Sequence, residues 1–457
     1  MALNIVIMAA GKGTRMKSQS PKVLHKLAGR SLLQHVLQTA AELQAERIVT
    51  ITGHGAEQVE AAVAAPNLKF VRQMPQLGTG HAVQQAVPAL LDEGITLILN
   101  GDVPLIQAAT LKALVQACSG KQLALLTIEL PDATGYGRIV REGQTVRAIV
   151  EHKDASEAQR RIREVYTGVM AAPTPVLKRW LARLKNDNAQ GEYYLTDVVA
   201  MAVAEGVPVT ATAAANEIEV MGINSPVQLA QLERRYQRAL AETLMESGVR
   251  LADPARLDVR GELQAGRDVE IDVNCVFEGC VQLGDNVRIG ANCCIRNASI
   301  APNAVIHPFT HIDGEALGVK VGAGSLIGPF ARLRPGADLA EDVHIGNFVE
   351  VKNSTMARGA KANHLAYLGD ATVGERVNYG AGSIIANYDG ANKHRTVIGA
   401  DVHVGSNCVL VAPITIGEGA TIGAGSTVTR NAPAAQLTLV RAKQVSLEHW
   451  TRPTRKK

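Results

Sequence analysis

Aliphatic residues return at every sixth position through much of the C-terminal half of the chain, and a second inward series stands four residues after the first. A helix returns its apolar stripe at a mixture of three and four residues, and a half-buried strand at every second residue. Two inward positions per six residues, separated by a turn, predict the short strands of a parallel β-helix, whose coils bury their apolar faces by stacking. A generic β-sandwich is the alternative. The regular series are Val321, Ile327, Leu333, Leu339, Ile345, Val351; Ile398, Val404, Leu410, Ile416, Ile422, Val428; and the shorter runs Leu283, Ile289, Ile295; Ile300, Ile306, Ile312; Val373, Tyr379, Ile385.

The period of six fails twice, around residues 353–367 and again over 387–396. A repeat that interrupts its own period commonly does so for a binding loop. We therefore expect ligand contacts at these two places.

The N-terminal half follows an α/β pattern, with short apolar strands and Gly-rich turns. Residues 4–8 read as a buried strand, and the loop Ala9-Ala10-Gly11-Lys12-Gly13 follows at once. Such a loop can cradle phosphates because its backbone N–H groups approach oxygens that a side chain would block. The spacing matches neither the P-loop nor the dinucleotide-binding fingerprint.

A long helix is predicted between the two patterns. Ser225 can cap it, Pro226 suits its first position, and Gly248 suits its end. The predicted domains are residues 1–226, a linker helix over 227–247, and residues 248–457.

Composition narrows the class of protein. With 457 residues and 46% hydrophobic content, the chain is expected to form two or three soluble domains. Aromatic residues make up only 3%, which argues against base-stacking platforms for nucleic acid, and the net charge is +4. The dense basic run at the C-terminus is expected to be a solvated, disordered tail; it comprises Arg452, Arg455, Lys456 and Lys457.

The six cysteines lack metal-site spacing and are expected to be small buried hydrophobes in a reducing compartment. No apolar run is long enough to span a bilayer, and the N-terminus lacks the features of a signal peptide. A cytoplasmic protein without membrane insertion is therefore expected.

The segment Met8-Ala9-Ala10-Gly11-x-Gly13-Thr14-Arg15-Met16, with Pro21-Lys22, resembles the signature of sugar-nucleotide pyrophosphorylases. These nucleotidyltransferases join a sugar 1-phosphate to a nucleoside triphosphate, so their site must neutralise phosphate charge. The resemblance implies a Rossmann-like domain in which Arg15 and Lys22 serve catalysis. It also implies Mg²⁺ held by Asp102, at the end of a strand, and by Asn224.

Further segments resemble, over essentially the whole chain, the bacterial family that joins an N-acetylglucosamine-1-phosphate uridyltransferase to a glucosamine-1-phosphate N-acetyltransferase. Where that family commonly shows Asn-Thr-Gly, this chain has Tyr166-Thr167-Gly168, so a sugar contact by an amide is lost. The resemblance implies that the nucleotide-sugar site uses Met8, Ala9, Ala10, Gly11, Lys22, Gln73, Gly78, Thr79, Asn100, Gly101, Asp102, Gly137, Glu151 and Asn224.

The β-helix resembles those of hexapeptide-repeat acyltransferases, which are left-handed and trimeric. Acetyl transfer to an amine needs a base and oxyanion donors, and histidine is the residue type whose ordinary pKa suits such a base. The resemblance implies His364 as catalytic base, and it also assigns contacts to both substrates. Glucosamine 1-phosphate meets Arg334, Lys352, Tyr367 and Asn378, while acetyl-coenzyme A meets Ala381, Asn387, Tyr388, Ser406, Ala424 and Arg441.

The implied function is the two-step synthesis of UDP-N-acetylglucosamine from glucosamine 1-phosphate, acetyl-coenzyme A and UTP, by a homotrimer. Two alternatives stay open: a pyrophosphorylase that uses its β-helix only for oligomerisation, and a catalytically silent regulatory subunit. The presence of His364 and Lys352 argues against the first, and Asp102 and Asn224 argue against the second.

Overall fold

The computed structural model describes residues 1–65 and 68–455. The chain divides into two compact units, Met1–Tyr236 and Gln237–Lys457, and the division falls inside helix α9 (Pro226–Glu246). Within the basic tail, Arg452 and Arg455 are exposed, whereas Lys456 and Lys457 lie outside the described residues. Each unit has an apolar core of its own.

The first unit is built on a mixed sheet with the order β11-β7-β10-β6-β1-β4-β5, to which the hairpin β8–β9 is added through β10. The central strand β1 is parallel to β4 and β6, whereas β10 runs antiparallel to β6 and β7. The strands of this unit, including the separate hairpin β2–β3, are β1 (Leu3–Met8), β2 (Lys26–Leu27), β3 (Arg30–Ser31), β4 (Arg47–Thr52), β5 (Leu68–Arg72), β6 (Ile95–Asn100), β7 (Leu123–Glu129), β8 (Arg138–Glu142), β9 (Thr145–Val150), β10 (Glu164–Pro173) and β11 (Val209–Ala213).

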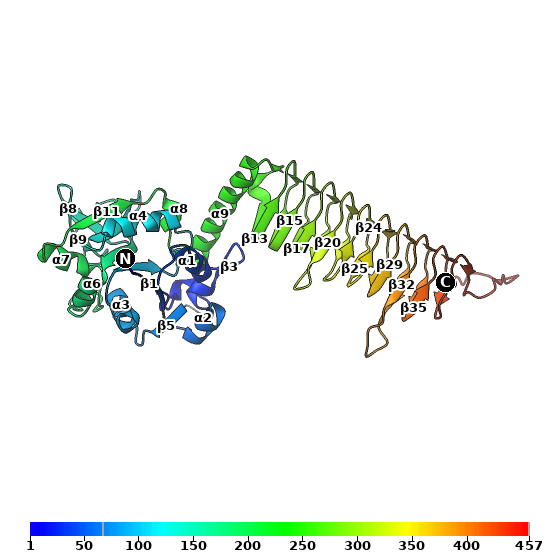
Figure 1. Cartoon of the computed structure of the whole chain (residues 1–457), viewed down its shortest axis with the longest axis horizontal. Helices are drawn as coiled ribbons and strands as arrows, with labels where there is room; N and C mark the ends of the chain where they lie inside the picture. Colours follow the sequence, from blue (N-terminus) through cyan, green and yellow to red (C-terminus); the bar gives the residue numbers. More distant parts are fainter. Residues whose placement is uncertain (66–67, 456–457) are drawn as a thin grey trace. The chain divides into compact units, whose positions relative to one another are not determined.

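Helices cover both faces of this sheet (Figure 1). Ile5 and Ile7 of β1 therefore belong to one apolar cluster and Val6 to the other, and all three are fully buried. Burial on both faces explains why β1 and β6 are continuous apolar runs. The helices are α1 (Leu32–Ala41), α2 (Ala56–Ala62), α3 (Thr79–Ala86), α4 (Ala108–Cys118), α5 (Glu157–Arg160), α6 (Thr174–Leu181), α7 (Asp197–Ala204) and α8 (Glu217–Val220).

The second unit is a parallel β-helix whose coils form three faces. In the first coils, three long strands turn a corner and serve two faces; they are β13 (Leu257–Ala265), β15 (Cys275–Leu283) and β17 (Cys294–Ile300). Face one is the 11-stranded sheet of β12 (Arg250–Leu251), β14 (Glu270–Ile271), β16 (Arg288–Ile289), β18 (Val305–Ile306), β21 (Leu326–Ile327), β24 (His344–Asn347), β27 (Lys361–His364), β30 (Asn378–Tyr379), β33 (His403–Val404), β36 (Thr421–Ile422) and β38 (Leu437–Thr438).

The other two faces belong to one 16-stranded sheet that bends at β17. Face two consists of β20 (Val319–Val321), β23 (Asp338–Leu339), β26 (Thr355–Met356), β29 (Ala371–Val373), β32 (Thr396–Ile398) and β35 (Ile414–Ile416). Face three consists of β19 (His311–Asp313), β22 (Arg332–Leu333), β25 (Glu350–Lys352), β28 (Tyr367–Gly369), β31 (Ile384–Ala386), β34 (Val409–Val411) and β37 (Thr427–Val428). We call the turns from face one to face three the first corner, and those from face three to face two the second corner.

The interior of the coils confirms the hexapeptide prediction. Every aliphatic residue of the two longest series is at most 2% exposed, and the residues four positions later, such as Val402 and Cys408, are also buried. The period of six therefore marks the side chains that stack between coils.

The two predicted interruptions differ in the structure. Around 353–367 the ladder continues through β26 and β27, and Lys361 pairs with Asn378 in the next coil. Asn378, in contrast, pairs with the more distant His403. This coil is longer because residues 387–395 form a loop that projects from it before β32 (Figure 1). The expectation of a loop was wrong for the first interruption, where the spacing merely slips, and is confirmed for the second.

Helix α9 begins as the sequence predicts, since Ser225 Oγ accepts a hydrogen bond from Gln228 N at 3.2 Å. No helix of the described residues is long and apolar enough to cross a membrane.

The prediction of uniformly buried cysteines was wrong for two of the six, because Cys280 is exposed and Cys294 is half-buried on the outside of a strand. Burial raises the pKa of Cys293 to about 12 and that of Cys275 to about 11, so these thiols stay protonated.

Candidate functional site

The Gly-rich loop leaves β1 at the carboxyl edge of the sheet. Gly13 has a positive φ of 61°, and a Cβ there would lie 2.6 Å from the Cβ of Lys22. Only glycine lets the loop turn this tightly while Lys22 passes beside it. The loop therefore fixes where the Lys22 ammonium points.

Two oxygens converge on that ammonium. Lys22 Nζ donates to Asp102 Oδ2 and, at 3.1 Å, to Asn224 Oδ1. Asn224 is itself held because its N–H donates to Gln228 Oε1 at 2.8 Å. Segments far apart in the sequence thus bring a carboxylate oxygen and an amide oxygen to the same ammonium group. We call the position where these two oxygens converge the cation point.

This donor set fits Mg²⁺, a hard cation that takes oxygen ligands and commonly binds through one or two protein groups plus water and phosphate oxygens. Clusters of three or more His, Cys, Asp or Glu side chains that could hold a metal are absent from the described part of the chain. A site that depends on Asp102 and Asn224 must therefore complete its coordination from the substrate and water.

A cavity of about 290 Å³ opens beside this point. Eight residues that the sequence singled out line it together, which brings the ends of β1, β6 and β9 to one place. They are Met8, Arg15, Thr79, Asn100, Asp102, Gly137, Glu151 and Asn224.

Other predicted residues support the rim of the cavity instead of lining it. Gln73 is 3% exposed, and its amide donates to Gly78 O at 2.9 Å. Gly101 N donates to Met8 O at 2.9 Å, which ties the end of β6 to the end of β1. Ala9 and Ala10 are buried, Gly11 is exposed with open space around it, and Lys22 lies at the cation point described above.

Glu151 is a half-buried acid that lines this cavity. Its carboxylate accepts a hydrogen bond from Thr196 Oγ1 at 3.0 Å, and burial raises its pKa above the usual range of a glutamate. Tyr166, which replaces the amide that the family commonly has, is 8% exposed and its hydroxyl has no partner among residues 1–65 and 68–455. Burial also raises the pKa of Tyr166, so its hydroxyl stays neutral.

Several residues of this cavity were not assigned a role from the sequence. Thr134, Tyr136, Thr196 and Gln228 line it, and Thr196 is the residue that fixes Glu151. Arg138, at 2% exposure, donates to Tyr136 O and approaches His152 Nδ1 at 3.2 Å, so it clamps two loops. Their roles depend on contacts across the fold that spacing along the chain does not reveal.

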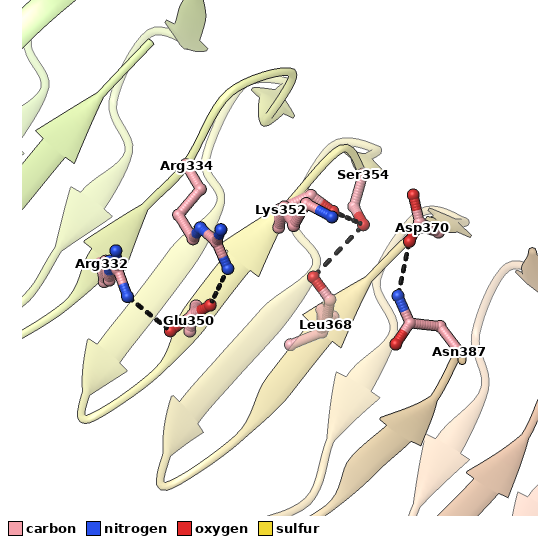
Figure 2. Close-up of polar contacts among 8 residues, drawn as sticks. All are labelled: Arg332, Arg334, Glu350, Lys352, Ser354, Leu368, Asp370 and Asn387. Atoms are coloured by element: carbon pink, nitrogen blue, oxygen red, sulfur yellow. Dashed lines mark hydrogen bonds and ion pairs between the residues drawn. The ribbon is translucent and has the colours of Figure 1, made fainter. Parts of the chain in front are cut away.

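In the β-helix, two of the residues predicted to bind glucosamine 1-phosphate, Arg334 and Lys352, lie on face three (Figure 2). Arg334 donates to Glu350 at 2.8 Å, and Arg332 reaches the same carboxylate at 3.4 Å. The nearby Lys393 ammonium lowers the pKa of Lys352, with a contribution from burial. Two ammonium groups this close favour an anion between them. Lys393 was not singled out from the sequence. The only signal for it was its position in the second interruption of the repeat.

His364 lies where β27 reaches the first corner, and its Nδ1 stands 3.5 Å from Asn347 Oδ1. Tyr367 begins β28 just beyond this corner, whereas Asn378 is an exposed residue of β30 on face one. His364 itself is exposed, so a ligand can reach it from outside.

The predicted acetyl-coenzyme A residues gather along the same corner in later coils. Asn407 N donates to Ala381 O, and Gly425 N donates to Ser406 O, each at 2.8 Å, so the corner turns stack. Arg441 Nη1 contacts Ala424 O at 3.1 Å. The two remaining predicted residues, Asn387 and Tyr388, begin the projecting loop. Ala381, Ser406, Ala424 and Arg441 therefore follow one another along the first corner, whereas Asn387 and Tyr388 lie at the second corner of the coil that contains Ala381.

Comparison with known proteins agrees with this two-part geometry. The family described as "MobA-like NTP transferase domain" matches residues 5–169, and "Bacterial transferase hexapeptide (six repeats)" matches residues 266–297 and 395–430. The hexapeptide match identifies the β-helix as the left-handed type.

Three relatives span the whole chain, and all are named "Bifunctional protein GlmU". The protein of Methylibium petroleiphilum is 72% identical, with 100% of both chains covered. That of Polaromonas naphthalenivorans is 70% identical, over 99% of this chain and 98% of the relative. That of Albidiferax ferrireducens is 68% identical, over 99% of this chain and 100% of the relative.

Proposed function

We propose, on the premise that the chain belongs to the GlmU family of bifunctional proteins, that each of its two units carries one step in the synthesis of UDP-N-acetylglucosamine. The enzyme is both an acetyltransferase and a uridylyltransferase. The observation that carries the proposal is that each unit has its own cluster of polar and cationic side chains: Lys22 with Asp102 and Asn224 beside the cavity of the first unit, and Lys352 with Lys393 in the β-helix.

In the β-helix, the amine of glucosamine 1-phosphate attacks the thioester carbonyl of acetyl-coenzyme A. The N–C bond forms, the C–S bond breaks, and the sulfur leaves as the thiolate of coenzyme A. His364 accepts the proton that the amine loses as general base, and this proton is then available to convert the thiolate to the thiol. Arg334, Lys352, Tyr367 and Asn378 hold the sugar phosphate, and the clustering of Lys352 with Lys393 supports this role.

In the first unit, a phosphate oxygen of N-acetylglucosamine 1-phosphate attacks the α-phosphorus of UTP, and pyrophosphate leaves. Arg15 and Lys22 neutralise the phosphate charge that develops. Bound at Asp102 and Asn224, Mg²⁺ supplies further charge neutralisation at the phosphates. Glu151 accepts hydrogen bonds from the sugar hydroxyls, and Tyr166 closes the wall beside it.

A homotrimer is the assembly that we propose. The predicted acetyl-transfer residues lie on faces one and three, whose outward side chains diverge, so a neighbouring copy is needed to close a cleft at the first corner. An exposed apolar ladder runs along this corner: Phe309, Phe330 and Phe348 stack with centroids 5.0 and 5.4 Å apart, and Leu365 follows directly after His364. Such a ladder supports burial against a second copy.

Cytoplasmic location is part of the same proposal. UTP and acetyl-coenzyme A are the substrates required, and the six cysteines are free thiols, as a reducing compartment allows.

Two variants test the proposal of separate sites. We expect His364→Ala to abolish thiol release from acetyl-coenzyme A while pyrophosphate release from UTP continues at the normal rate. We expect Asp102→Ala to do the reverse, because it removes a carboxylate oxygen from the cation point. Equal loss of both activities in either variant contradicts two sites.

The same assays on the unmodified protein decide between the alternatives. Pyrophosphate release without thiol release identifies a pyrophosphorylase with a structural β-helix, and the absence of both identifies a silent subunit.

A further inference from the structure

A buried carboxylate stands in the second corner, next to the proposed acetyl-transfer site. Asp370 is 6% exposed, and its two oxygens accept hydrogen bonds from the side-chain amides of Asn353 and Asn387 in the neighbouring coils. Figure 2 shows the bond to Asn387. None of the ion pairs formed within residues 1–65 and 68–455 includes Asp370. The hydrogen-bond partners of its carboxylate are thus two neutral amides, one on either side, while its charge also acts on the nearby Lys352 ammonium.

Other corners carry similar ladders, but they are made of asparagines. Asn274 donates to Asn292 at 3.1 Å, and Asn286 donates to Asn303 at 3.1 Å. An asparagine offers both a donor and an acceptor, so such a ladder can run in either direction. An ionised carboxylate is acceptor-only, and both amides beside Asp370 must therefore present their NH₂ groups to it.

This requirement fixes the orientation of Asn387. Its Nδ2 faces Asp370, so its Oδ1 faces away from the ladder, as Figure 2 shows. No donor is paired with that oxygen anywhere in the described chain, and the side chain is 7% exposed. Asn387 is also the residue where the projecting loop begins, and His394 N returns to its carbonyl at 2.8 Å.

We propose that Asp370 is a positioning residue for acetyl transfer: it holds Asn387 so that Oδ1 is presented as an acceptor to an N–H donor of the bound ligands. The inference rests on the proposed acetyltransferase function and deepens it. Two N–H donors belong to that reaction, the amine of glucosamine 1-phosphate and the amide groups of the coenzyme A arm. Either of these N–H groups can donate a hydrogen bond to Asn387 Oδ1.

Two substitutions at Asp370 separate orientation from charge. Asp370 has a positive φ of 52°, which both glycine and asparagine tolerate. Asp370→Gly removes the acceptor and frees the Asn387 amide to turn. Asp370→Asn can still accept from Asn387, because the exposed Asn353 can flip and receive the new NH₂ group at no loss of hydrogen bonds.

For Asp370→Gly we expect kcat/KM for acetyl transfer to fall about tenfold, the effect of one misplaced hydrogen bond. The fall should appear as a higher KM for a single substrate: for glucosamine 1-phosphate if its amine is the donor, or for acetyl-coenzyme A if an arm amide is the donor. A merely structural role would lower the active fraction and leave both KM values unchanged. Asp370→Asn should recover most of the lost activity.

The matched control is Asn292→Asp, which places a carboxylate in a corner ladder of another coil where Asn274 can still donate to it. It should leave both reactions unchanged. Unchanged KM values in Asp370→Gly, or an Asp370→Asn variant as impaired as Asp370→Gly, would overturn the inference. Pyrophosphate release from UTP serves as the internal standard in every variant. Loss of thiol release in the unmodified protein would instead reject the proposed function.

Discussion

At the scale of single residues, the half-buried carboxyl of Glu151 combines a proposed binding role with a cost to stability. Burial raises its pKa in the folded protein, so the folded state binds more protons than the unfolded state between the ordinary glutamate pKa and the raised value. Stability therefore falls as pH rises through that window, and the full destabilisation is present above it.

We expect Glu151→Gln to raise the Tm of the first unit by about 2 °C at neutral pH, because it removes the buried charge while Gln can still accept from Thr196. The same change should lower uridylyl transfer, since a neutral amide accepts sugar hydroxyls more weakly than a carboxylate does. Calorimetry at pH 4 and pH 8 tests whether the gain in Tm is larger at the higher pH, as the raised pKa of Glu151 requires. An equal gain in Tm at both pH values contradicts the prediction.

Lys22 makes a second prediction at this scale, because its ammonium occupies the point where Asp102 and Asn224 oxygens converge. Lys22→Gln should reduce kcat/KM for uridylyl transfer by about 10²-fold, through loss of charge neutralisation. The residual activity should reach half its maximum at a lower Mg²⁺ concentration, since no ammonium competes for the oxygens. A Mg²⁺ titration measures both, and an unchanged midpoint contradicts the shared cation point. Lys12→Gln, on the same loop, is the control.

At the scale of elements, the projecting loop of residues 387–395 is closed by its own contacts. Asp389 accepts from Ala391 N at 2.8 Å, from Asn392 N at 2.7 Å, and contacts His394 Nε2 at 2.6 Å. These hydrogen bonds lower the pKa of Asp389 below the usual aspartate range, so the contacts hold at neutral pH and are lost only as pH falls through that low pKa.

Asp389→Ala should therefore loosen the loop without unfolding the coils. We expect faster hydrogen exchange within 387–395, an unchanged Tm for the β-helix, and an acetyl-coenzyme A KM that is several-fold higher, on the order of the loss of one positioning contact. Hydrogen exchange with mass detection follows the loop directly. Unchanged exchange would show that the strands on either side order the loop by themselves.

At the scale of the whole molecule, the trimer that we propose should depend on the ladder of Phe309, Phe330 and Phe348 at the first corner. These side chains are 46–57% exposed, and each occupies a positive φ, which a bulky residue adopts only at a cost. Replacing Phe330 and Phe348 by asparagine, which tolerates that conformation, should dissociate the trimer, lower acetyl transfer strongly and spare uridylyl transfer.

Sedimentation measures the assembly, and Leu317→Asn is the matched control, because Leu317 is 73% exposed but lies away from the ladder. If the double variant remains trimeric, the interface lies on another part of the β-helix.

The sequence by itself determined the β-helix, because each coil repeats the same burial requirement and a period of six cannot serve a helix or an ordinary strand. It also determined the phosphate loop, since Gly13 is needed locally wherever the chain turns that tightly. The cation point and the cavity were recovered through resemblance, and the structure brings Asp102 and Asn224 to one place.

Only the tertiary structure decided the rest. Thr196 reaches Glu151, Lys393 reaches Lys352, and Asp370 orients Asn387 across separate turns of chain. The spacing of residues along the chain does not indicate such pairs, because the side chains meet only after sheets or coils have stacked. The same reason explains why the change of spacing near 353–367 was mistaken for a loop. The inward positions are one residue closer together there, but the strands of successive coils still pair without interruption.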